Sequence, residues 1–464
     1  MRDVHVLGRV GHAMDELPNV GERIRIRVQS LENEVEHVGL VLPFMNQDFI
    51  TLKLDNGYNA SYTIDGIVSW ESLGSSPLQQ KPDNQGAAAF AKDLPRVRLI
   101  HTGGTIASKV DYKTGAVIAR FEPEELVAEL PELTNIAQLE TFKIGNMFSD
   151  DIRPQHWNHI VNATKQAFDE GCRGVVVAHG TDTLHLSAAA VGFAWAGRGE
   201  KAPGPIAFVG SQRSSDRGSS DAPENLLSAV YWAAHGEAPC GDVGDSTVVI
   251  MHHTSNDGEC VVLPGMSTRK LHSSRRDAFQ AVNAQPLATI SYDGSDCSHT
   301  TTVAYSEAIV AGGRKVATNV NGFLPHLKIL QFIAGPYLHG EHIEATVKDG
   351  CDAIIIHGTG LGHLPIEDSM GDAPENQNLW RTLVRCVNRE IPIIVCNQCI
   401  FGPVNMNVYS KGREQQKIGL LGHGIAGAPD TVAIKAHWLL SNNLSLNENI
   451  AKPLCGEQTD VLFE

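Results

Sequence analysis

Two threonines follow two short apolar segments, and their hydroxyls could take part in covalent acyl transfer. Thr105 follows Arg98-Leu-Ile-His-Thr-Gly-Gly, and Thr181 follows Gly174-Val-Val-Val-Ala-His-Gly. Apolar and β-branched runs of this kind are typical of buried parallel strands. Because open α/β sheets bind ligands at the carboxyl ends of their strands, we expect both hydroxyls at one edge of a sheet.

A threonine hydroxyl is a weak nucleophile, so this chemistry needs a neighbouring base. Asp182 follows Thr181 directly, but a solvated carboxylate is too weak a base to act alone. Lys270, in Met266-Ser-Thr-Arg-Lys, could accept the proton if the fold held its amine in a desolvated place. Taken alone, an Arg-Lys pair is more often solvated surface. Gly103 and Gly104 would let backbone N–H groups approach an oxyanion.

The elements that position these groups alternate between strand and helix patterns from about residue 96 onward, which favours an α/β fold with a mainly parallel, doubly wound sheet. One helix is predicted from the apolar face of Trp157, Ile160 and Val161, and it ends before Gly171. The predicted strands are 97–101, 174–179, 205–210, 247–252, 353–357 and 392–397.

The N-terminal part has a different pattern. Ile24 and Ile26 alternate with arginines, and Asn56-Gly57 is a hairpin signal. We expect a small SH3-like β-barrel there; the alternative is a β-extension without a fold of its own. The predicted domains are a β-barrel module over 1–75, a linker over 76–95, a large α/β domain over 96–315, a smaller α/β domain over 335–440 and a tail over 441–464.

Composition limits the class of protein. The chain has 464 residues, 42% of them hydrophobic, and a net charge of -16. Such an acidic chain repels polyanions, so we expect any nucleic-acid contact to be made mainly by a partner. We expect a cytoplasmic protein without a membrane span, because neither a secretory leader nor a long apolar run is visible. Nine cysteines in so long a chain argue against a disulfide framework.

The two threonine motifs resemble those of a known enzyme family. Thr-Gly-Gly-Thr-Ile-Ala at 102–107 and His-Gly-Thr-Asp-Thr at 179–183 are similar to the two signatures of bacterial-type L-asparaginases. The β-rich N-terminal module and Asn397-Gln-Cys-Ile-Phe-Gly-Pro-Val-Asn-Met-Asn-Val-Tyr further resemble the D subunits of archaeal glutamyl-tRNA(Gln) amidotransferases. The resemblance covers nearly the whole chain, and it implies an asparaginase-like fold behind the N-terminal module.

The resemblance also assigns catalytic roles. Thr105 matches the flexible-loop threonine, which we expect to be the acyl acceptor. Thr181, Asp182 and Lys270 match a second group that lines up the reactants and moves protons. Which threonine attacks first stays open at this stage.

Substrate contacts are implied in the same way. Asp182 is expected to bind the substrate's α-amino group, and Ser149 and Gly104 to contact the substrate. Tyr112 falls in the segment that acts as a mobile lid in asparaginases. His363 departs from the pattern, because asparaginases often have an asparagine there that supports the neighbouring subunit's site.

The implied function is an amidohydrolase subunit that releases ammonia from glutamine or asparagine, with the preferred donor left open. The E subunit would bind Glu-tRNA(Gln), activate its glutamate with ATP and Mg, and add the ammonia. No cofactor is expected in this chain, and a homodimer within a heterotetramer is expected. The alternatives are a free-standing cytoplasmic L-asparaginase and a non-catalytic scaffold that binds tRNA or a partner.

Three further motifs have less specific interpretations. Cys396-Asn-Gln-Cys399 could be redox-active or half of a zinc site, but a buried strand end is favoured, and no metal site is expected. Gly358-Thr-Gly-Leu-Gly-His lacks the spacing of a nucleotide loop and is interpreted as a turn after a strand. Arg23, Arg25 and Arg27 could contact RNA phosphate, although the solvated face of a strand is favoured.

Overall fold

The computed structural model describes residues 4–6, 17–29, 33–42, 48–54, 59–75, 93–103, 109–110, 117–118, 130–213, 220–236, 247–293, 300–305 and 313–458. Three of the predicted site residues, Gly104, Thr105 and Tyr112, lie outside these described residues. So do residues 76–92 of the predicted linker and residues 459–464 of the predicted tail.

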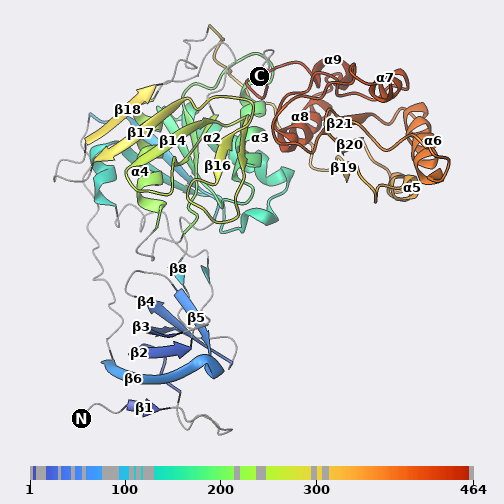
Figure 1. Ribbon diagram of the computed structural model, residues 1–464. Helices are drawn as coiled ribbons and strands as arrows, with labels where there is room; N and C mark the ends of the chain where they lie inside the picture. Colours follow the sequence, from blue (N-terminus) through green and yellow to red (C-terminus); the bar gives the residue numbers. More distant parts are fainter. Residues whose placement is uncertain are drawn as a thin grey trace.

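Six antiparallel strands form the N-terminal unit (Figure 1). In sheet order they are β1 (Val4–Val6), β6 (Ile67–Ser75), β2 (Glu22–Gln29), β3 (Glu34–Leu42), β4 (Phe49–Leu54) and β5 (Asn59–Thr63). The expected alternation is confirmed, because Ile24, Ile26, Ile50 and Leu52 are all fully buried and pack around Trp70. The unit therefore has a core of its own. No pairing among the described residues joins β1 to β5, so closure into an SH3-like barrel stays a prediction.

An eight-stranded sheet forms the framework of the next unit. Its strands, in sheet order, are β10 (Gln138–Lys143), β7 (Arg96–His101), β11 (Gly174–Ala178), β12 (Ile206–Val209), β13 (Thr247–His252), β14 (Glu259–Pro264), β17 (Ala288–Asp293) and β18 (Thr300–Tyr305). The first five run parallel, as expected for a mainly parallel sheet. The last three add antiparallel pairings that the sequence analysis did not predict.

Helices cover both faces of this sheet, as a doubly wound fold requires. The helix α4 (Ala222–His235) packs on one face through a core that contains Leu226 and Trp232. The helices α2 (Pro154–Asp169) and α3 (Leu184–Ala196) pack on the other face, through a core that contains Ile160 and Val191. Every residue of β11 is buried between these two cores, which explains its unbroken apolar run.

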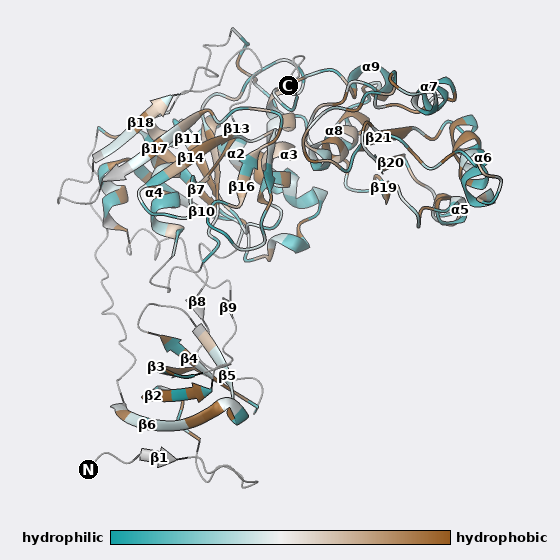
Figure 2. Cartoon of the chain, viewed as in Figure 1, coloured by the Kyte–Doolittle hydropathy of each residue, from teal (hydrophilic) through white to brown (hydrophobic). Residues whose placement is uncertain are grey.

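A smaller α/β unit follows. Its parallel sheet consists of β19 (Ile329–Ile333), β20 (Ala353–Gly358) and β21 (Ile393–Asn397). Its helices are α5 (Gly340–Lys348), α6 (Pro374–Asn388), α7 (Ser410–Lys417), α8 (Pro429–Ser441) and α9 (Leu446–Asn449). Figure 2 shows β20 and β21 in the brown of apolar residues and α7 in the teal of polar ones. The strands are thus the buried layer of this unit.

The helix α8 joins the two α/β units. Trp438 of α8 stacks on Phe193 of α3, with ring centroids 5.9 Å apart, and both side chains are fully buried. The chain then continues against the body, since Ile450 and Cys455 are also buried. The described part of the predicted tail therefore packs on the body. The domain boundaries themselves stay a prediction.

Several short elements complete the fold. The hairpin of β15 (Thr268–Lys270) and β16 (Phe279–Ala281) carries the predicted lysine. The others are β8 (Lys109–Val110), β9 (Val117–Ile118) and the 3-10 turns η1 (Ile64–Gly66), η3 (Pro131–Asn135) and η4 (Ser149–Asp151). In the part of the chain that the structure describes, no helix has the length and apolar character that a bilayer crossing needs.

Candidate active site

Thr181 lies in the loop that joins the central strand β11 to helix α3. The strand ends at Ala178, and His179 and Gly180 lead to the threonine, whose side chain is buried. His179 is fully buried and donates from Nδ1 to the Gly180 carbonyl oxygen at 2.7 Å. Burial lowers the pKa of His179 to about 4, so the ring beneath the threonine is neutral at physiological pH.

Lys270 reaches this loop from the end of β15. Its Nζ donates to Thr181 Oγ1 at 2.9 Å and to Asp182 Oδ1 at 2.8 Å. Only 9% of the lysine side chain is exposed, against 67% of the Asp182 side chain. The amine is therefore held in a largely dry place, between an alcohol and a carboxylate that opens to solvent. The structure brings Lys270 to the adjacent Thr181 and Asp182, although the lysine and the aspartate are 88 residues apart in sequence.

Ser149 packs against the same loop. It begins η4, its side chain is buried, and its carbonyl oxygen accepts the Thr183 hydroxyl at 2.5 Å. A Cβ on Gly180 would lie 2.8 Å from both the Cβ and the Oγ of Ser149. Glycine is thus required at position 180 because the serine approaches so closely. Ser149 therefore lies beside the Thr181 loop.

The strand β7 ends beside β11, at the same edge of the sheet. His101 pairs with Ala178, and the Thr102 N–H donates to the Ala178 carbonyl oxygen at 3.1 Å. Gly103 follows with a φ of 123°, and a Cβ there would lie 2.2 Å from the Met147 carbonyl oxygen. The chain that leads into Thr105 therefore departs from the edge that holds the Thr181 loop. Thr105 itself lies outside the described residues.

Gln212 belongs to this group, and the sequence analysis did not single it out. The Thr181 hydroxyl donates to Gln212 Oε1 at 3.5 Å. Among the described residues, Gln212 Nε2 is buried and has no hydrogen-bond partner. The loop that carries it follows β12, and the buried Asp221 accepts the Gln212 N–H at 3.0 Å. Its place after a strand next to β11 was the available signal.

An ion-pair network supports the lysine strand from behind. Asp430, in the first turn of α8, lies 3.2 Å from Arg269 Nε and 3.3 Å from His185 Nε2. Burial alone would raise the pKa of Asp430, but the His185 hydrogen bond and the Arg269 charge outweigh it and hold the pKa below its ordinary value. The carboxylate therefore stays charged and joins β15 to α3 and α8.

Two further hydrogen bonds hold the segment before the lysine. Thr431 Oγ1 donates to the Met266 carbonyl oxygen at 3.1 Å, and Ser267 Oγ donates to the Gly456 carbonyl oxygen at 2.7 Å. Both partners come from the C-terminal part of the chain. The position of Lys270 therefore depends on residues far along the sequence.

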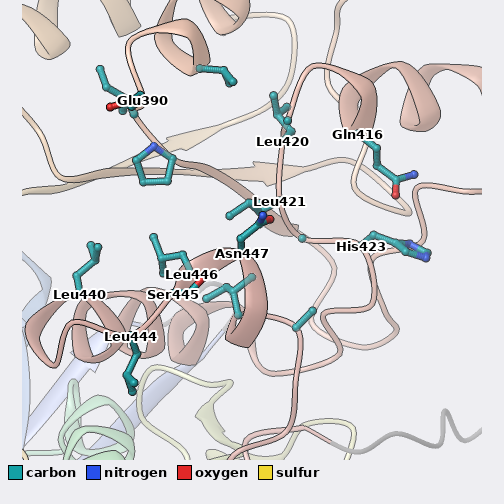
Figure 3. A pocket seen from close by; sticks show the side chains of 17 residues that line it. Glu390, Gln416, Leu420, Leu421, His423, Leu440, Leu444, Ser445, Leu446 and Asn447 are labelled. Carbon is teal, nitrogen blue, oxygen red and sulfur yellow. The ribbon is translucent and has the colours of Figure 1, made fainter.

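A cavity of about 840 Å³ lies elsewhere, in the smaller unit (Figure 3). Its walls include Leu420, Leu440 and Leu446, with His423 at one side. None of the threonine, lysine or aspartate groups described above lines it. Its described lining offers no serine or threonine held by a base, so the strand-end group is the candidate for acyl transfer.

Comparison with known proteins now bears on this geometry. The family model "Asparaginase, N-terminal" matches residues 96–303, and "Glutaminase/Asparaginase C-terminal domain" matches 328–451. A third model, "GatD N-terminal domain", matches residues 19–71. The chain is 38% identical to the D subunit of the glutamyl-tRNA(Gln) amidotransferase from Thermofilum pendens, over 87% of this chain and 84% of the relative. The chain belongs to the family of glutamyl-tRNA(Gln) amidotransferase D subunits.

A second relative and a solved structure support the same family and fold. The D subunit of the amidotransferase from Metallosphaera sedula is 36% identical over 95% of this chain and 93% of its own length. The solved structure of the thermostable L-asparaginase from Thermococcus kodakarensis matches with a TM-score of 0.61 and 26% identity. That likeness covers 78% of this chain and 99% of the asparaginase. The expected asparaginase-like fold and family membership are confirmed.

Two of the less specific motifs lie where strands end. Cys396, one residue before the end of β21, is fully buried, and burial raises the pKa of its thiol to about 12, as expected for an inert strand end. All seven cysteines in the described residues are free. The residues after β20 form a turn in which the Thr359 N–H donates to the His363 carbonyl oxygen at 3.0 Å. This agrees with the predicted strand-end turn.

Two other features bear on contacts with RNA and with a neighbouring subunit. Arg25 forms ion pairs with Glu36 and Glu71, and Arg27 with Glu36. Their charges are therefore matched by carboxylates of the same sheet, which favours the solvated-face interpretation. His363 contacts the Tyr409 ring edge-on, with centroids 5.2 Å apart. No described contact links either feature to the Thr181 loop.

Proposed function

We propose that the chain is the ammonia-releasing subunit of a tRNA-dependent amidotransferase. It hydrolyses the side-chain amide of glutamine or asparagine, so that a partner subunit can convert Glu-tRNA(Gln) to Gln-tRNA(Gln). The observation that carries this proposal is the position of Lys270 Nζ, 2.9 Å from Thr181 Oγ1 and 2.8 Å from Asp182 Oδ1. Membership of the D-subunit family supports the same function.

The proposed reaction begins with the Thr105 hydroxyl. Its oxygen bonds to the amide carbon while its proton passes toward the Thr181 and Lys270 pair. Backbone N–H groups at Gly103 and Gly104 stabilise the oxyanion. The C–N bond then breaks, the nitrogen takes up a proton, and ammonia leaves. Water finally cleaves the acyl ester, which releases glutamate or aspartate and restores the hydroxyl.

The Lys270 amine must shed a proton to serve as the base in this scheme. In the structure it donates to both Thr181 Oγ1 and Asp182 Oδ1. Substrate would change this balance, because its α-amino group would pair with the exposed Asp182 carboxylate and draw that charge away from the lysine. Binding and proton transfer are thereby coupled through one carboxylate.

The substrate's own amide needs partners that fix its orientation. Ser149 lies against Gly180, and Gln212 offers a buried side-chain amide without a hydrogen bond among the described residues. Such an unsatisfied group favours a polar ligand that completes its hydrogen bonds. We assign Ser149, Gly104 and Gln212 to substrate positioning, and Tyr112 to a lid that excludes water during the reaction.

The second half of the reaction belongs to the partner. The E subunit would bind Glu-tRNA(Gln) and use ATP and Mg to activate the glutamate, while this chain needs no cofactor. Its net charge of -16 suits this division, because an acidic chain attracts no polyanion. Ammonia must pass between the subunits before bulk water protonates it. We place this assembly in the cytoplasm, as a homodimer of this chain within a heterotetramer.

A free-standing L-asparaginase is the second candidate, since the solved structure of such an enzyme matches 78% of the chain. The N-terminal sheet argues against it and for the amidotransferase, because residues 19–71 match the GatD N-terminal domain. A non-catalytic scaffold is the candidate from another class. It gives no reason for a lysine that is 9% exposed to contact both a threonine and an aspartate.

The test compares two nitrogen donors. Full-length chain and its partner are assayed for Gln-tRNA(Gln) formation with glutamine and, separately, with ammonium chloride. We expect Thr181→Val to lower the glutamine-dependent rate by about 10²-fold or more while the ammonia-dependent rate is unchanged. Thr346→Val is the matched control, because Thr346 lies in α5 and bonds only within that helix. Equal loss with both donors would contradict the proposal, and fast asparagine hydrolysis by the chain alone would favour the asparaginase.

A further inference from the structure

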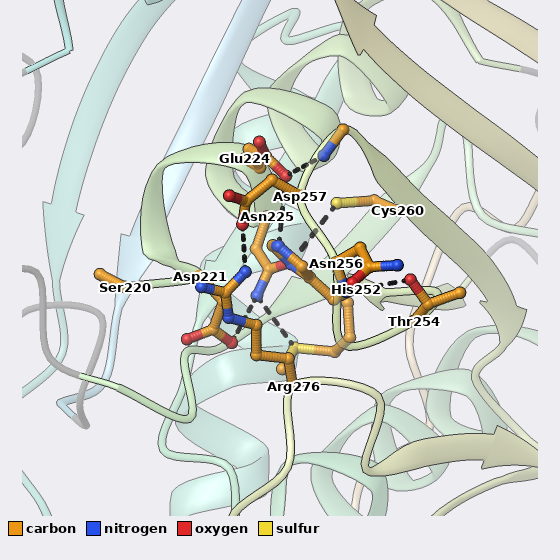
Figure 4. A network of polar contacts seen from close by, with 12 residues as sticks. Ser220, Asp221, Glu224, Asn225, His252, Thr254, Asn256, Asp257, Cys260 and Arg276 are labelled. Carbon is orange, nitrogen blue, oxygen red and sulfur yellow. Dashed lines mark hydrogen bonds and ion pairs between the residues drawn. The ribbon is translucent and has the colours of Figure 1, made fainter. Parts of the chain in front are cut away.

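Three side chains of metal-binding types meet beside the end of β13, in a cluster that the proposed reaction does not use (Figure 4). Glu224 comes from α4, His252 ends β13, and Asp257 lies in the loop before β14. One ligand atom of each lies within 4.8 Å of the others. His252 is buried, whereas 22% of the Glu224 side chain and 73% of the Asp257 side chain are exposed.

Asn225 fixes the proton on the His252 ring. Its Nδ2 donates to the Gly210 carbonyl oxygen at 3.0 Å and to Asp221 Oδ2 at 3.1 Å. Both of these atoms only accept, so the orientation of the Asn225 amide is determined. Its Oδ1 then faces His252 Nδ1 at 2.7 Å. Because Asn225 Oδ1 cannot donate, Nδ1 of the histidine must carry the hydrogen.

A neutral His252 ring therefore presents a lone pair on Nε2. Glu224 Oε2, which is also an acceptor, lies 3.2 Å from it. Nε2 is buried and makes no hydrogen bond among the described residues. A protonated ring would pair directly with that carboxylate, so a cation is needed only while the ring is neutral. A cation held between the nitrogen and the carboxylate would satisfy both.

We propose that Glu224, His252 and Asp257 bind one divalent transition-metal ion, with Zn²⁺ as the preferred member of that class. An imidazole nitrogen with two carboxylates and a water makes a four-coordinate set that suits Zn²⁺. Asn225 holds the ring as a hydrogen-bonded partner commonly does behind a metal-bound histidine. Mg²⁺ and Ca²⁺ are disfavoured because both select oxygen ligands.

The surroundings are arranged for such an ion. Glu224 Oε2 accepts the Gly258 N–H at 2.9 Å, which fixes the carboxylate before any ion arrives. Arg276 forms an ion pair with Asp257 and offsets part of the negative charge. The exposed Asp257 can rotate to shorten its distance to the ion. The ion would tie α4, β13 and the loop before β14 together, and it takes no part in the bond-breaking steps of the proposed amide hydrolysis.

The test is a calorimetric titration of the untagged full-length chain, stripped of metal by a chelator, with Zn²⁺, Mg²⁺ and Ca²⁺. We expect one Zn²⁺ per chain and no comparable binding of Mg²⁺ or Ca²⁺. Glu224→Gln and Asp257→Asn should each weaken Zn²⁺ binding by about tenfold or more. Glu259→Gln is the matched control, because Glu259 pairs with the exposed neighbour His253 at 2.7 Å and should leave the affinity unchanged.

Asp257→Asn decides the matter if Glu224→Gln does not fold, because the Asp257 side chain is 73% exposed and should tolerate the change. The proposal is overturned if the unaltered chain binds no Zn²⁺ in a one-to-one ratio. It is equally overturned if Asp257→Asn and Glu259→Gln bind Zn²⁺ with the affinity of the unaltered chain.

Discussion

Arg269 and Asp430 form an ion pair across the boundary between the two α/β units, with Arg269 Nε 3.2 Å from Asp430 Oδ2. Arg269 is the neighbour of Lys270 on β15, and Asp430 lies in the first turn of α8. The same aspartate oxygen lies 3.3 Å from His185 Nε2 in α3, the helix that follows the Thr181 loop. One carboxylate thus holds the strand of the lysine and the helix behind the threonine in a fixed relation.

We first predict that Asp430→Asn lowers the rate of glutamine hydrolysis and destabilises the fold. The asparagine amide keeps the shape of the Asp430 carboxylate but loses the negative charge, which both Arg269 and His185 contact. Breaking such a partly buried pair should reduce the free energy of unfolding by about 1–3 kcal/mol. The rate should fall by about tenfold or more, because small displacements of a positioned base are costly. Ammonia release and urea unfolding measure the two effects.

Asp372→Asn serves as the control for this variant, because Asp372 is exposed in the same unit. It should change neither quantity. A normal rate in Asp430→Asn would show that the position of Lys270 does not depend on the ion pair.

A second prediction concerns Lys270 itself. Lys270→Met should reduce kcat for glutamine hydrolysis by about 10²-fold or more, since the proton acceptor is lost. Lys270→Arg should not restore the rate, because a guanidinium keeps its proton under all working conditions. Lys165→Met is the control, since it removes a surface Lys–Asp pair with an Nζ–Oδ2 distance of 2.6 Å. A fully active Lys270→Arg would mean that the charge matters and proton acceptance does not.

A third prediction tests the close approach of Ser149. Gly180→Ala places a Cβ 2.8 Å from the Ser149 side chain, so either the serine or the Thr181 loop must shift. We expect a loss of about 1–3 kcal/mol in the free energy of unfolding, together with a raised KM for glutamine. Gly313→Ala is the control, because a Cβ there meets nothing within 4 Å. An unchanged KM would remove Ser149 from the substrate site.

A fourth prediction concerns pH. Burial lowers the pKa of His179 to about 4 in the folded chain, while an unfolded histidine titrates near about 6.5. Between these values the unfolded state binds the extra proton. His179 therefore supports stability fully above about pH 6.5, and that contribution falls by about 3 kcal/mol as the pH drops to about 4.

Urea unfolding of the unaltered chain and of His179→Gln across this pH range provides the measurement. Subtracting one unfolding free energy from the other gives the contribution of His179 alone, although the chain has twenty histidines. The variant should show the shallower dependence on pH. Parallel curves for the two proteins would mean that His179 does not stay neutral in the fold.

Much of the framework could be predicted from local pattern. The run at 174–178 is apolar at every position because β11 is covered on both faces, and its glycine and threonine mark the strand end. Ile24 and Ile26 are buried and alternate with less buried arginines because the N-terminal sheet has one buried face. These features depend on neighbours in sequence, so periodicity alone reveals them.

The support of the lysine was beyond that method, whereas the pairing of β14 with β13 was overlooked. The loop between these two strands contains Asp257-Gly258, a hairpin signal that the sequence analysis did not use. Gln212 and Asp430 meet Thr181 and Arg269 only after residues far apart in sequence are brought together. Side-chain pairs of that separation follow from tertiary packing, and no local spacing records them.

The Ser267 hydroxyl, three residues before Lys270, donates to the carbonyl oxygen of Gly456. Glu457, next along the chain, forms an ion pair with Lys435 in which both side chains are only 2% exposed. A truncation that removed Gly456 and Glu457 would therefore take away the support of the lysine. Recombinant versions of this protein should keep both residues.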